Sequence, residues 1–216
     1  MKIALIGATG FVGSHILEEL ISRKHYITAV VRNSGKVTIK SEFLTLAEAD
    51  VFDAKALVEA LTGNELVISA YNPGWTNPNI YHDFLKGSQA IQAAVKLAGI
   101  HRYLVIGGAG SLEIAGKQLV DGPDFPAAIK PGAMAARDYL QILRTEKELE
   151  WTFFSPAIEM HQGITTGRTG KYRLGKDHPV FDENGRCVLS VEDLAVAIAD
   201  EAENHQFPYQ RFTAAY

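Results

Sequence analysis

The chain has 216 residues, a formal net charge of −4 at pH 7 and a single cysteine, Cys187. This length accommodates one α/β domain, residues 1–216, with room for a small region that covers a substrate. A mixed, slightly acidic charge provides no basic surface for nucleic acid or an anionic membrane, so we expect a small-molecule partner. No stretch approaches the length of a membrane span, and one cysteine cannot form an internal disulfide. We therefore predict a soluble protein of the cytoplasm.

The most informative segment follows an apolar run at residues 3–6 and precedes a helical pattern at 14–20. Its sequence is Gly7-Ala8-Thr9-Gly10-Phe11-Val12-Gly13. The three glycines permit a tight turn, the approach of backbone N–H groups to a pyrophosphate, and close packing of the helix on the sheet. Their spacing, Gly-x-x-Gly-x-x-Gly, is typical of short-chain or extended dehydrogenases. We therefore predict a dinucleotide site whose binding residues are Gly7, Thr9, Gly10, Phe11, Val12 and Gly13.

Strands and helices alternate through the following part of the chain. Runs of β-branched residues and helical spacing of apolar residues predict strands at 26–31, 43–53, 66–70 and 102–107, and helices at 54–61 and 81–98. Such βαβ alternation is characteristic of a doubly wound parallel sheet. The predicted fold is therefore α/β and Rossmann-like, with a small C-terminal region that covers the substrate.

Four residues at the carboxyl ends of these strands are candidate neighbours of the cofactor. Arg32 follows the second strand, where an arginine accommodates the 2′-phosphate of NADPH and an acidic residue would favour NADH. It predicts a preference for NADP(H), with NAD(H) possible, and a solvated basic turn is the alternative. Asp53 is expected either near the adenine or as the N-cap of the next helix. Ala70 and Tyr71 end the fourth strand and are expected beside the nucleotide.

The second half of the chain has a less regular pattern. Gly and Pro are frequent in a long loop at 108–131, and the segment 156–190 is irregular. Because loops at the carboxyl ends of strands often cover ligands, we expect these two segments to build the substrate pocket. The remaining expectations are a helix at about 133–148, a strand at 151–155, an edge strand at 170–175, a helix from a capping box at Ser190 to Ala202, and a short strand at 211–213.

Two residues are candidates for catalysis. Ser111 follows the glycine-rich end of the fifth strand, where its hydroxyl would reach nicotinamide or a substrate carbonyl, or else stabilise a turn. His161 follows the sixth strand and is a candidate proton shuttle, or a surface residue. The tyrosine–lysine pair of short-chain dehydrogenases is incomplete, because Tyr139 is followed four residues later by Leu143. No metal-ligand pattern is present, and we expect no metal.

Several motifs together resemble the NADH-flavin reductases among the atypical short-chain dehydrogenases. The resemblance extends over nearly the whole chain. Its motifs are the segments at 7–13, 105–111, 151–157, 168–175, 190–195 and 211–213. Relatives of this group include flavin, biliverdin and quinone reductases and redox-sensing regulators. The resemblance implies a Rossmann fold and a reduced nicotinamide cofactor, but it leaves the substrate open because one fold serves several activities.

These observations favour an NAD(P)H-dependent oxidoreductase that transfers hydride to a flavin, a quinone or a similar conjugated acceptor. Such acceptors take their proton from water, so the incomplete tyrosine–lysine pair is tolerated. The alternative is a non-enzymatic sensor of NAD(P) state that regulates a protein partner. A sugar-nucleotide epimerase is a third possibility, which the missing lysine and the short C-terminal region disfavour.

Overall fold

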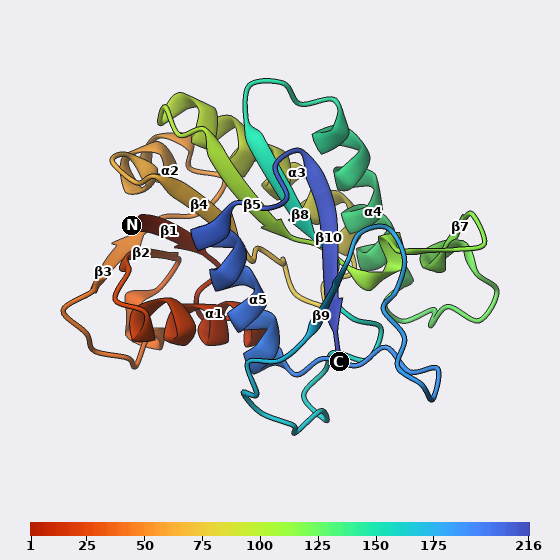
Figure 1. Ribbon diagram of the computed structural model, residues 1–216. Coiled ribbons are helices and arrows are strands. Elements are labelled where there is room, and N and C mark those ends of the chain that lie inside the picture. The colour runs from red at the N-terminus through yellow and green to blue at the C-terminus, as the bar shows by residue number, and fades with distance from the viewer.

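The computed structural model describes residues 1–216 and contains a central eight-stranded sheet with helices on both faces (Figure 1). The strand order is β3-β2-β1-β4-β5-β8-β10-β9, and every pair is parallel except β10 with β9. The strands are β1 Lys2–Ile6, β2 Tyr26–Val31, β3 Leu44–Glu48, β4 Leu66–Ser69, β5 Arg102–Ile106, β8 Glu150–Phe154, β9 Arg173–Gly175 and β10 Gln210–Ala215. The predicted Rossmann-like α/β fold is confirmed.

The central strands, such as β1, β4 and β5, are largely apolar on both sides because helices cover both faces of the sheet. Helices α1 (Phe11–Ser22) and α5 (Val191–Asn204) pack on one face, and α2 (Ala54–Leu61), α3 (Ile80–Leu97) and α4 (Lys130–Arg144) pack on the other (Figure 1). Strand β1 contributes to both cores in turn. Ile3 and Leu5 point toward α1 and α5, whereas Ala4 and Ile6 point toward the other three helices.

The sheet reverses its winding direction beside β1. From β1 the chain proceeds outward through β2 and β3, then crosses back to place β4 on the other side of β1. In open α/β sheets the ligand crevice lies outside the carboxyl ends of the strands at such a switch point. The turn between β1 and α1 therefore lies where open α/β sheets bind their ligands.

The second half differs in detail from the sequence expectation. Helix α4 occupies 130–144 instead of about 133–148, because Pro131 lies in its first turn, where proline is favoured. The loop at 108–131 contains a small hairpin, β6 Glu113–Ile114 and β7 Lys117–Gln118, and the short 3₁₀ turns η2 (Ala109–Ser111) and η3 (Leu119–Asp121). Isolated dipeptide strands of this kind have too few residues for a recognisable alternation.

Two local expectations for the C-terminal part are confirmed. The Ser190 hydroxyl accepts a hydrogen bond from the Asp193 N–H at 3.1 Å and caps α5. Strand β9 forms the edge of the sheet beside β10. None of the five α-helices combines the length and apolar character that a membrane crossing requires.

Candidate functional site

The turn between β1 and α1 depends on two close backbone contacts. Gly7 has a φ of +83°, and a Cβ on it would lie 2.5 Å from the Ala70 carbonyl oxygen. A Cβ on Gly13 would lie 2.1 Å from the Gly7 carbonyl oxygen. Both distances are far below contact distance, so only glycine permits this packing of β1, α1 and the end of β4. Gly10 has a common extended conformation, and a Cβ on it would meet only the Gly7 carbonyl oxygen, at an ordinary contact distance of 3.4 Å.

Helix α1 begins without a side-chain cap. Gly10 is the N-cap and donates its own N–H to the Gly7 carbonyl, and Ser14 donates to the Gly10 carbonyl. The N–H groups of Phe11, Val12 and Gly13 have no acceptor in the protein. Unpaired N–H groups at a helix N-terminus form an anion site, which the helix dipole strengthens. The turn therefore fits the pyrophosphate of a dinucleotide.

Arg32 lies directly after β2, exposed and without an ion pair or hydrogen bond in the protein. The following turn already contains a carboxylate, because the Ser34 N–H donates to Glu48 Oε1 at 2.8 Å. Hydrogen bonds from Ser34 lower the pKa of the Glu48 carboxyl. Arg32 is thus available for an external anion, while Glu48 places a negative charge beside the same turn.

Ala70 and Tyr71 lie at the end of β4, beside the β1–α1 turn. The Ala70 N–H donates to the Ile6 carbonyl at 2.9 Å, which extends the sheet up to the turn. The Tyr71 hydroxyl donates to the Asp83 carbonyl at 3.2 Å, and its ring lies against Gly87, where a Cβ would come within 2.4 Å. Burial raises the pKa of Tyr71 to about 12, assisted by nearby Asp83 and Asp50 and opposed by Arg32.

Asp53 serves as the N-cap of α2. Its Oδ1 accepts a hydrogen bond from the Ala56 N–H at 3.1 Å. Of the two interpretations of this residue, the cap is the one that the structure forms. A contact between Asp53 and adenine stays a prediction.

Ser111 lies in the short turn η2 after β5, next to the carboxyl end of β8. Its hydroxyl donates to the Gly108 carbonyl at 2.9 Å and lies 2.8 Å from the Ser155 hydroxyl. Both serines are fully buried. The Ser111 hydroxyl is therefore engaged within the protein, and its part in catalysis stays a prediction.

His161 lies in the segment that leaves β8. It is exposed, and its Nδ1 accepts a hydrogen bond from the Gly163 N–H at 3.1 Å, within its own turn. No hydrogen bond joins it to Ser111 or Ser155. The structure thus brings the two serines together but leaves His161 at the surface, where a role as a proton shuttle is untested.

Arg211 is a polar residue of this region that the sequence analysis assigned no role. It belongs to β10, its side chain is only 1% exposed, and it donates to the Ser111 carbonyl and to Asp177. Its Nη2 also lies 3.1 Å from Glu113 Oε1. It therefore joins the 108–131 segment to the 156–190 segment. An arginine inside the apolar strand pattern at 211–213 is the signal that could have indicated a buried role.

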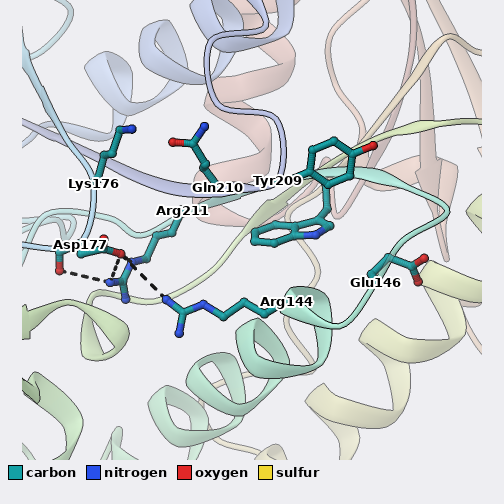
Figure 2. Close-up of a pocket in the computed structure, with 8 residues that line it drawn as sticks. Arg144, Glu146, Lys176, Asp177, Tyr209, Gln210 and Arg211 are labelled. Carbon is teal, nitrogen blue, oxygen red and sulfur yellow. Dashed lines mark hydrogen bonds and ion pairs between the residues drawn. The ribbon is translucent and has the colours of Figure 1, made fainter.

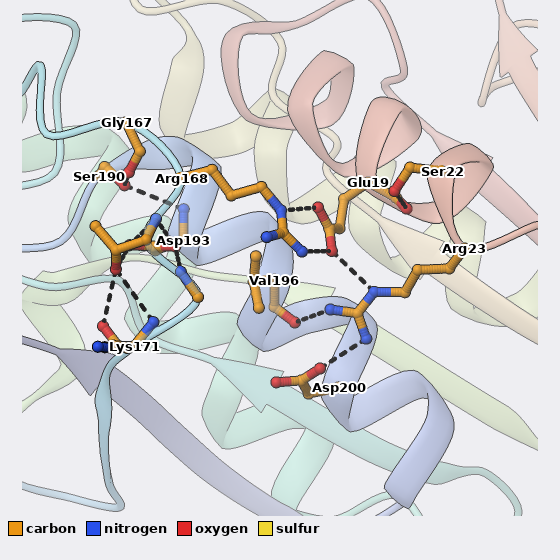
Figure 3. A network of polar contacts seen from close by, with 12 residues as sticks. Glu19, Ser22, Arg23, Gly167, Arg168, Lys171, Ser190, Asp193, Val196 and Asp200 are labelled. Atoms are coloured by element: carbon orange, nitrogen blue, oxygen red, sulfur yellow. Dashed lines mark hydrogen bonds and ion pairs between the residues drawn. The ribbon is translucent and has the colours of Figure 1, made fainter.

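The 156–190 segment is also fastened to the helices on the α1/α5 face (Figure 3). The fully buried Asp193 carboxylate accepts from the Thr169 N–H at 2.9 Å, the Gly170 N–H at 2.7 Å and the Tyr216 hydroxyl at 2.7 Å. Arg168 makes a paired contact with Glu19 of α1, with Nε and Nη2 at 2.8 and 2.9 Å from its two oxygens. Part of this segment therefore covers α1 and α5 and is held in place by buried carboxylates.

Three groups of side chains that sequence reasoning placed near a cofactor thus lie along one edge of the sheet. They are the β1–α1 turn, the Arg32 turn after β2, and Ala70 with Tyr71 after β4. In the structure no three His, Cys, Asp or Glu side chains are grouped so as to hold a metal ion. The arrangement can bind a dinucleotide across the ends of β1, β2 and β4.

Comparison with known proteins agrees with this geometry. Residues 7–205 match the model of a family described as NAD(P)H-binding. A structure from Bacteroides thetaiotaomicron, described as a candidate epimerase, is 45% identical, with a TM-score of 0.91 and coverage of 100% of this chain and 96% of that chain. A candidate exported protein from Burkholderia pseudomallei is 41% identical, with a TM-score of 0.87 and coverage of 100% of both chains.

A further similar structure comes from Streptococcus pneumoniae and is described as a candidate NADH-flavin reductase. It is 35% identical, with a TM-score of 0.86 and coverage of 100% of this chain and 99% of that chain. The predicted resemblance to the nicotinamide-dependent, atypical short-chain dehydrogenase group is confirmed at the level of family and fold.

Proposed function

This chain belongs to the NAD(P)H-binding family, and we propose that it is an NADPH-dependent reductase of a flavin, a quinone or a similar conjugated acceptor. The main support for the proposal is the start of α1, where three backbone N–H groups have no acceptor in the protein. This turn also contains Gly7 and Gly13, two positions that only glycine can occupy. The bound nicotinamide would supply the hydride. The protein would hold its reduced ring against the acceptor, which converts a rare encounter into a proximate reaction.

The preference for NADPH in this proposal rests on Arg32. Its free guanidinium suits a 2′-phosphate, for which charge-assisted hydrogen bonds are strong. Glu48 opposes the same phosphate through its negative charge beside Ser34. We therefore expect a preference for NADPH that still permits use of NADH.

The choice of a conjugated acceptor is supported by the position of Tyr139. Its hydroxyl is fully buried in the core beneath α3 and α4, where the Ser88 carbonyl and Gln92 Oε1, each at 3.1 Å, can accept its single proton. Burial raises its pKa well above the ordinary value. A tyrosine in this position cannot deliver a proton to an acceptor at the sheet edge. Flavins and quinones do not require such an acid, because water protonates the reduced product.

In this proposal the acceptor lies against the segments 108–131 and 156–190, near Ser111, Ser155 and His161. We expect the serines to shape the wall beside the nicotinamide and His161 to contact bulk water and the acceptor's outer edge. The enzyme is proposed to act in the cytoplasm, as its one buried and unpaired cysteine suggests, and cell fractionation would test this.

The deciding experiment follows NADPH absorbance in the presence of flavins and quinones. We expect catalytic oxidation of NADPH by at least one acceptor. Ser111→Ala and His161→Ala should alter the acceptor KM or kcat while leaving the NADPH Kd unchanged. Tight NADPH binding without turnover of any acceptor, combined with an NADPH-dependent affinity for a protein partner, would establish the sensor alternative instead.

An epimerase function is the second candidate, because the Bacteroides thetaiotaomicron neighbour is described in that way. Leu143 stands where short-chain dehydrogenases place the catalytic lysine, and Tyr139 is buried. Both features disfavour proton transfer at a sugar carbon. Incubation with nucleotide sugars and NAD⁺, followed by chromatographic separation of epimers, tests this candidate directly.

A further inference from the structure

A cavity of about 340 Å³ is lined by residues of β8 and β10 and of the segments that follow α4 and β9 (Figure 2). Trp151 lies near the start of β8, and Tyr209 and Gln210 lie at the start of β10, so the cavity opens at the amino ends of these parallel strands. The β1–α1 turn follows the carboxyl end of β1 in the same sheet. The cavity therefore opens away from the β1–α1 turn, and Arg211 of its lining connects it to the Ser111 carbonyl. Its volume is within the usual range for small-ligand sites.

Among the cationic groups that line this cavity, only Lys176 lacks a carboxylate partner, because Arg211 is also paired with Glu113 at 3.1 Å. Arg144, Lys176 and Arg211 line it together with two carboxylates, Asp177 and Glu146. Asp177 accepts from Arg211 and lies 3.9 Å from Arg144 Nη2, so it is shared between two guanidinium groups. The Lys176 ammonium forms no ion pair in the structure.

The second lining carboxylate, Glu146, is engaged by groups outside the cavity. Glu146 is only 4% exposed and lies 2.7 Å from the Lys96 ammonium, which is outside the cavity. It also accepts hydrogen bonds from Gln92 and from the backbone N–H groups of Lys147 and Glu148. Lys96 is shared with the exposed Glu148, which lies 3.0 Å from it. The unpaired Lys176 is therefore the group that would attract an anion placed in the cavity.

One wall of the cavity is aromatic. Tyr209 is 49% exposed, and the nearly buried Trp151 lines the same cavity. Tyr209 also has a φ of +58°, in the left-handed region that a tyrosine rarely adopts. Such strained positions are frequent where a side chain is held ready for a ligand. The ring therefore provides an exposed flat surface next to the cationic groups.

We propose that this cavity binds a small aromatic carboxylate. The carboxylate would lie between Arg144 and Lys176, with the Gln210 amide as an additional donor, and the ring would lie against Tyr209. The hydride acceptor of the proposed reaction is a different ligand, because it must meet the nicotinamide at the other edge of the sheet. This inference does not depend on the proposed reductase activity.

The test is a titration of the intact protein with benzoate, followed by ¹H–¹⁵N correlation spectra. We expect shifts of the Trp151 indole and Gln210 side-chain signals, with a Kd of about 1 mM or tighter. Benzamide, which has the same shape without the charge, and inorganic phosphate, which has the charge without the ring, should each bind more weakly.

Two variants test the named contacts. Lys176→Met should weaken benzoate binding about fivefold or more, whereas Lys55→Met, which removes an exposed lysine on α2, should not. Tyr209→Gly removes the aromatic wall and relieves the positive φ, so it should weaken benzoate binding without lowering the melting temperature.

Several results would overturn the proposal. Equal affinity for benzamide would remove the role of charge, and equal affinity for phosphate would remove the role of the ring. Benzoate shifts confined to the Gly7–Gly13 turn would place binding at the cofactor edge. Unchanged benzoate affinity in both Lys176→Met and Tyr209→Gly would show that benzoate does not bind in this cavity.

Discussion

Arg32 is an exposed side chain whose replacement we expect to change cofactor preference without affecting the fold. It forms no contact within the protein, so its replacement removes no internal hydrogen bond. Its neighbourhood combines one free positive charge with the carboxylate of Glu48, held at the Ser34 N–H. Preference between NADPH and NADH should therefore reflect a balance of these two charges.

We expect Arg32→Ala to weaken NADPH binding by about ten- to hundredfold and NADH binding much less, because only NADPH has a 2′-phosphate. Isothermal titration with both nucleotides measures the two affinities. Lys36→Ala is the matched control, since it removes another exposed cation from the same turn. Glu48→Gln should change the ratio in the opposite direction. An equal loss for both nucleotides would show that Arg32 does not contact the phosphate.

Tyr139 represents the opposite situation, a buried hydroxyl far from solvent. Tyr139→Phe should retain most of the reductase activity, because the hydroxyl is enclosed between Ser88, Gln92 and Tyr103. It should cost about 1–2 kcal/mol of stability by leaving buried acceptors unpaired, which lowers the melting temperature by about 2–8 °C. Calorimetry and steady-state kinetics measure both effects. A thousandfold loss of turnover in a folded variant would instead make Tyr139 the catalytic acid.

At the scale of elements, the three glycines before and within the first turn of α1 have different roles. Gly7 and Gly13 are required by backbone contacts with the end of β4 and with each other, whereas a Cβ on Gly10 would make only an ordinary 3.4 Å contact with the Gly7 carbonyl oxygen. Replacing Gly7 or Gly13 should damage the fold. A substitution at Gly10 should therefore change dinucleotide affinity while leaving the fold intact.

Gly10→Val should largely abolish dinucleotide binding, because its side chain would occupy the space through which a pyrophosphate approaches the α1 N–H groups. A valine N-cap should lower stability only modestly, by up to about 1 kcal/mol. Gly10→Ala should give an intermediate loss of affinity. Fluorescence titration with NADPH and a thermal melt test both statements. Unchanged affinity in the folded valine variant would mean that the phosphate binds elsewhere.

Helix α5 anchors the 156–190 segment through its first turn. Asp193→Asn should cost about 2 kcal/mol or more, because an amide cannot accept from all the donors that converge on this carboxylate. Amide hydrogen exchange should accelerate at Thr169 and Gly170. Glu192→Gln, in the same turn but half-buried, is the control. Unchanged exchange at both amides would show that other contacts hold the segment.

At the scale of the whole molecule, acid stability depends on carboxylates that are ion-paired in the folded state. Burial alone would raise the pKa of Glu146, but hydrogen bonds from Lys96, the Glu148 N–H and Gln92 outweigh it and lower the pKa to about 2. The pKa of Glu19 is lowered mainly by Arg168. Both groups bind protons more readily when unfolded, so their stabilisation is complete above about pH 5 and decreases as the pH falls toward 2.

Glu146→Gln should therefore reduce the free energy of unfolding by about 2 kcal/mol at pH 7 and make it less dependent on pH between about 5 and 2. Urea denaturation at several pH values measures this. Glu148→Gln is the matched control, because Glu148 also contacts Lys96 but is 74% exposed. An identical pH dependence in Glu146→Gln and the unmodified protein would contradict the assignment.

The sequence alone determined the first half of the molecule well, because its signals are local. An apolar run followed by spaced glycines predicts the β1–α1 turn, and strand–helix alternation predicts the parallel sheet. Caps such as Asp53 and Ser190 act within a few residues and were recognised. The bounds of α4 and the hairpin inside 108–131 were less well predicted, since short elements provide little periodicity.

Only the tertiary structure decided which polar residues are buried and which groups they contact. Arg211 meets the Ser111 carbonyl across 100 positions, and Arg168 meets Glu19 across 149. No pattern along the chain reports such pairings, because they arise when the sheet order and loop packing bring distant segments together. Local hydrogen bonding and periodicity thus specified the fold and the β1–α1 turn, whereas long-range packing specified the position of the 156–190 segment and the cavity at the amino ends of β8 and β10.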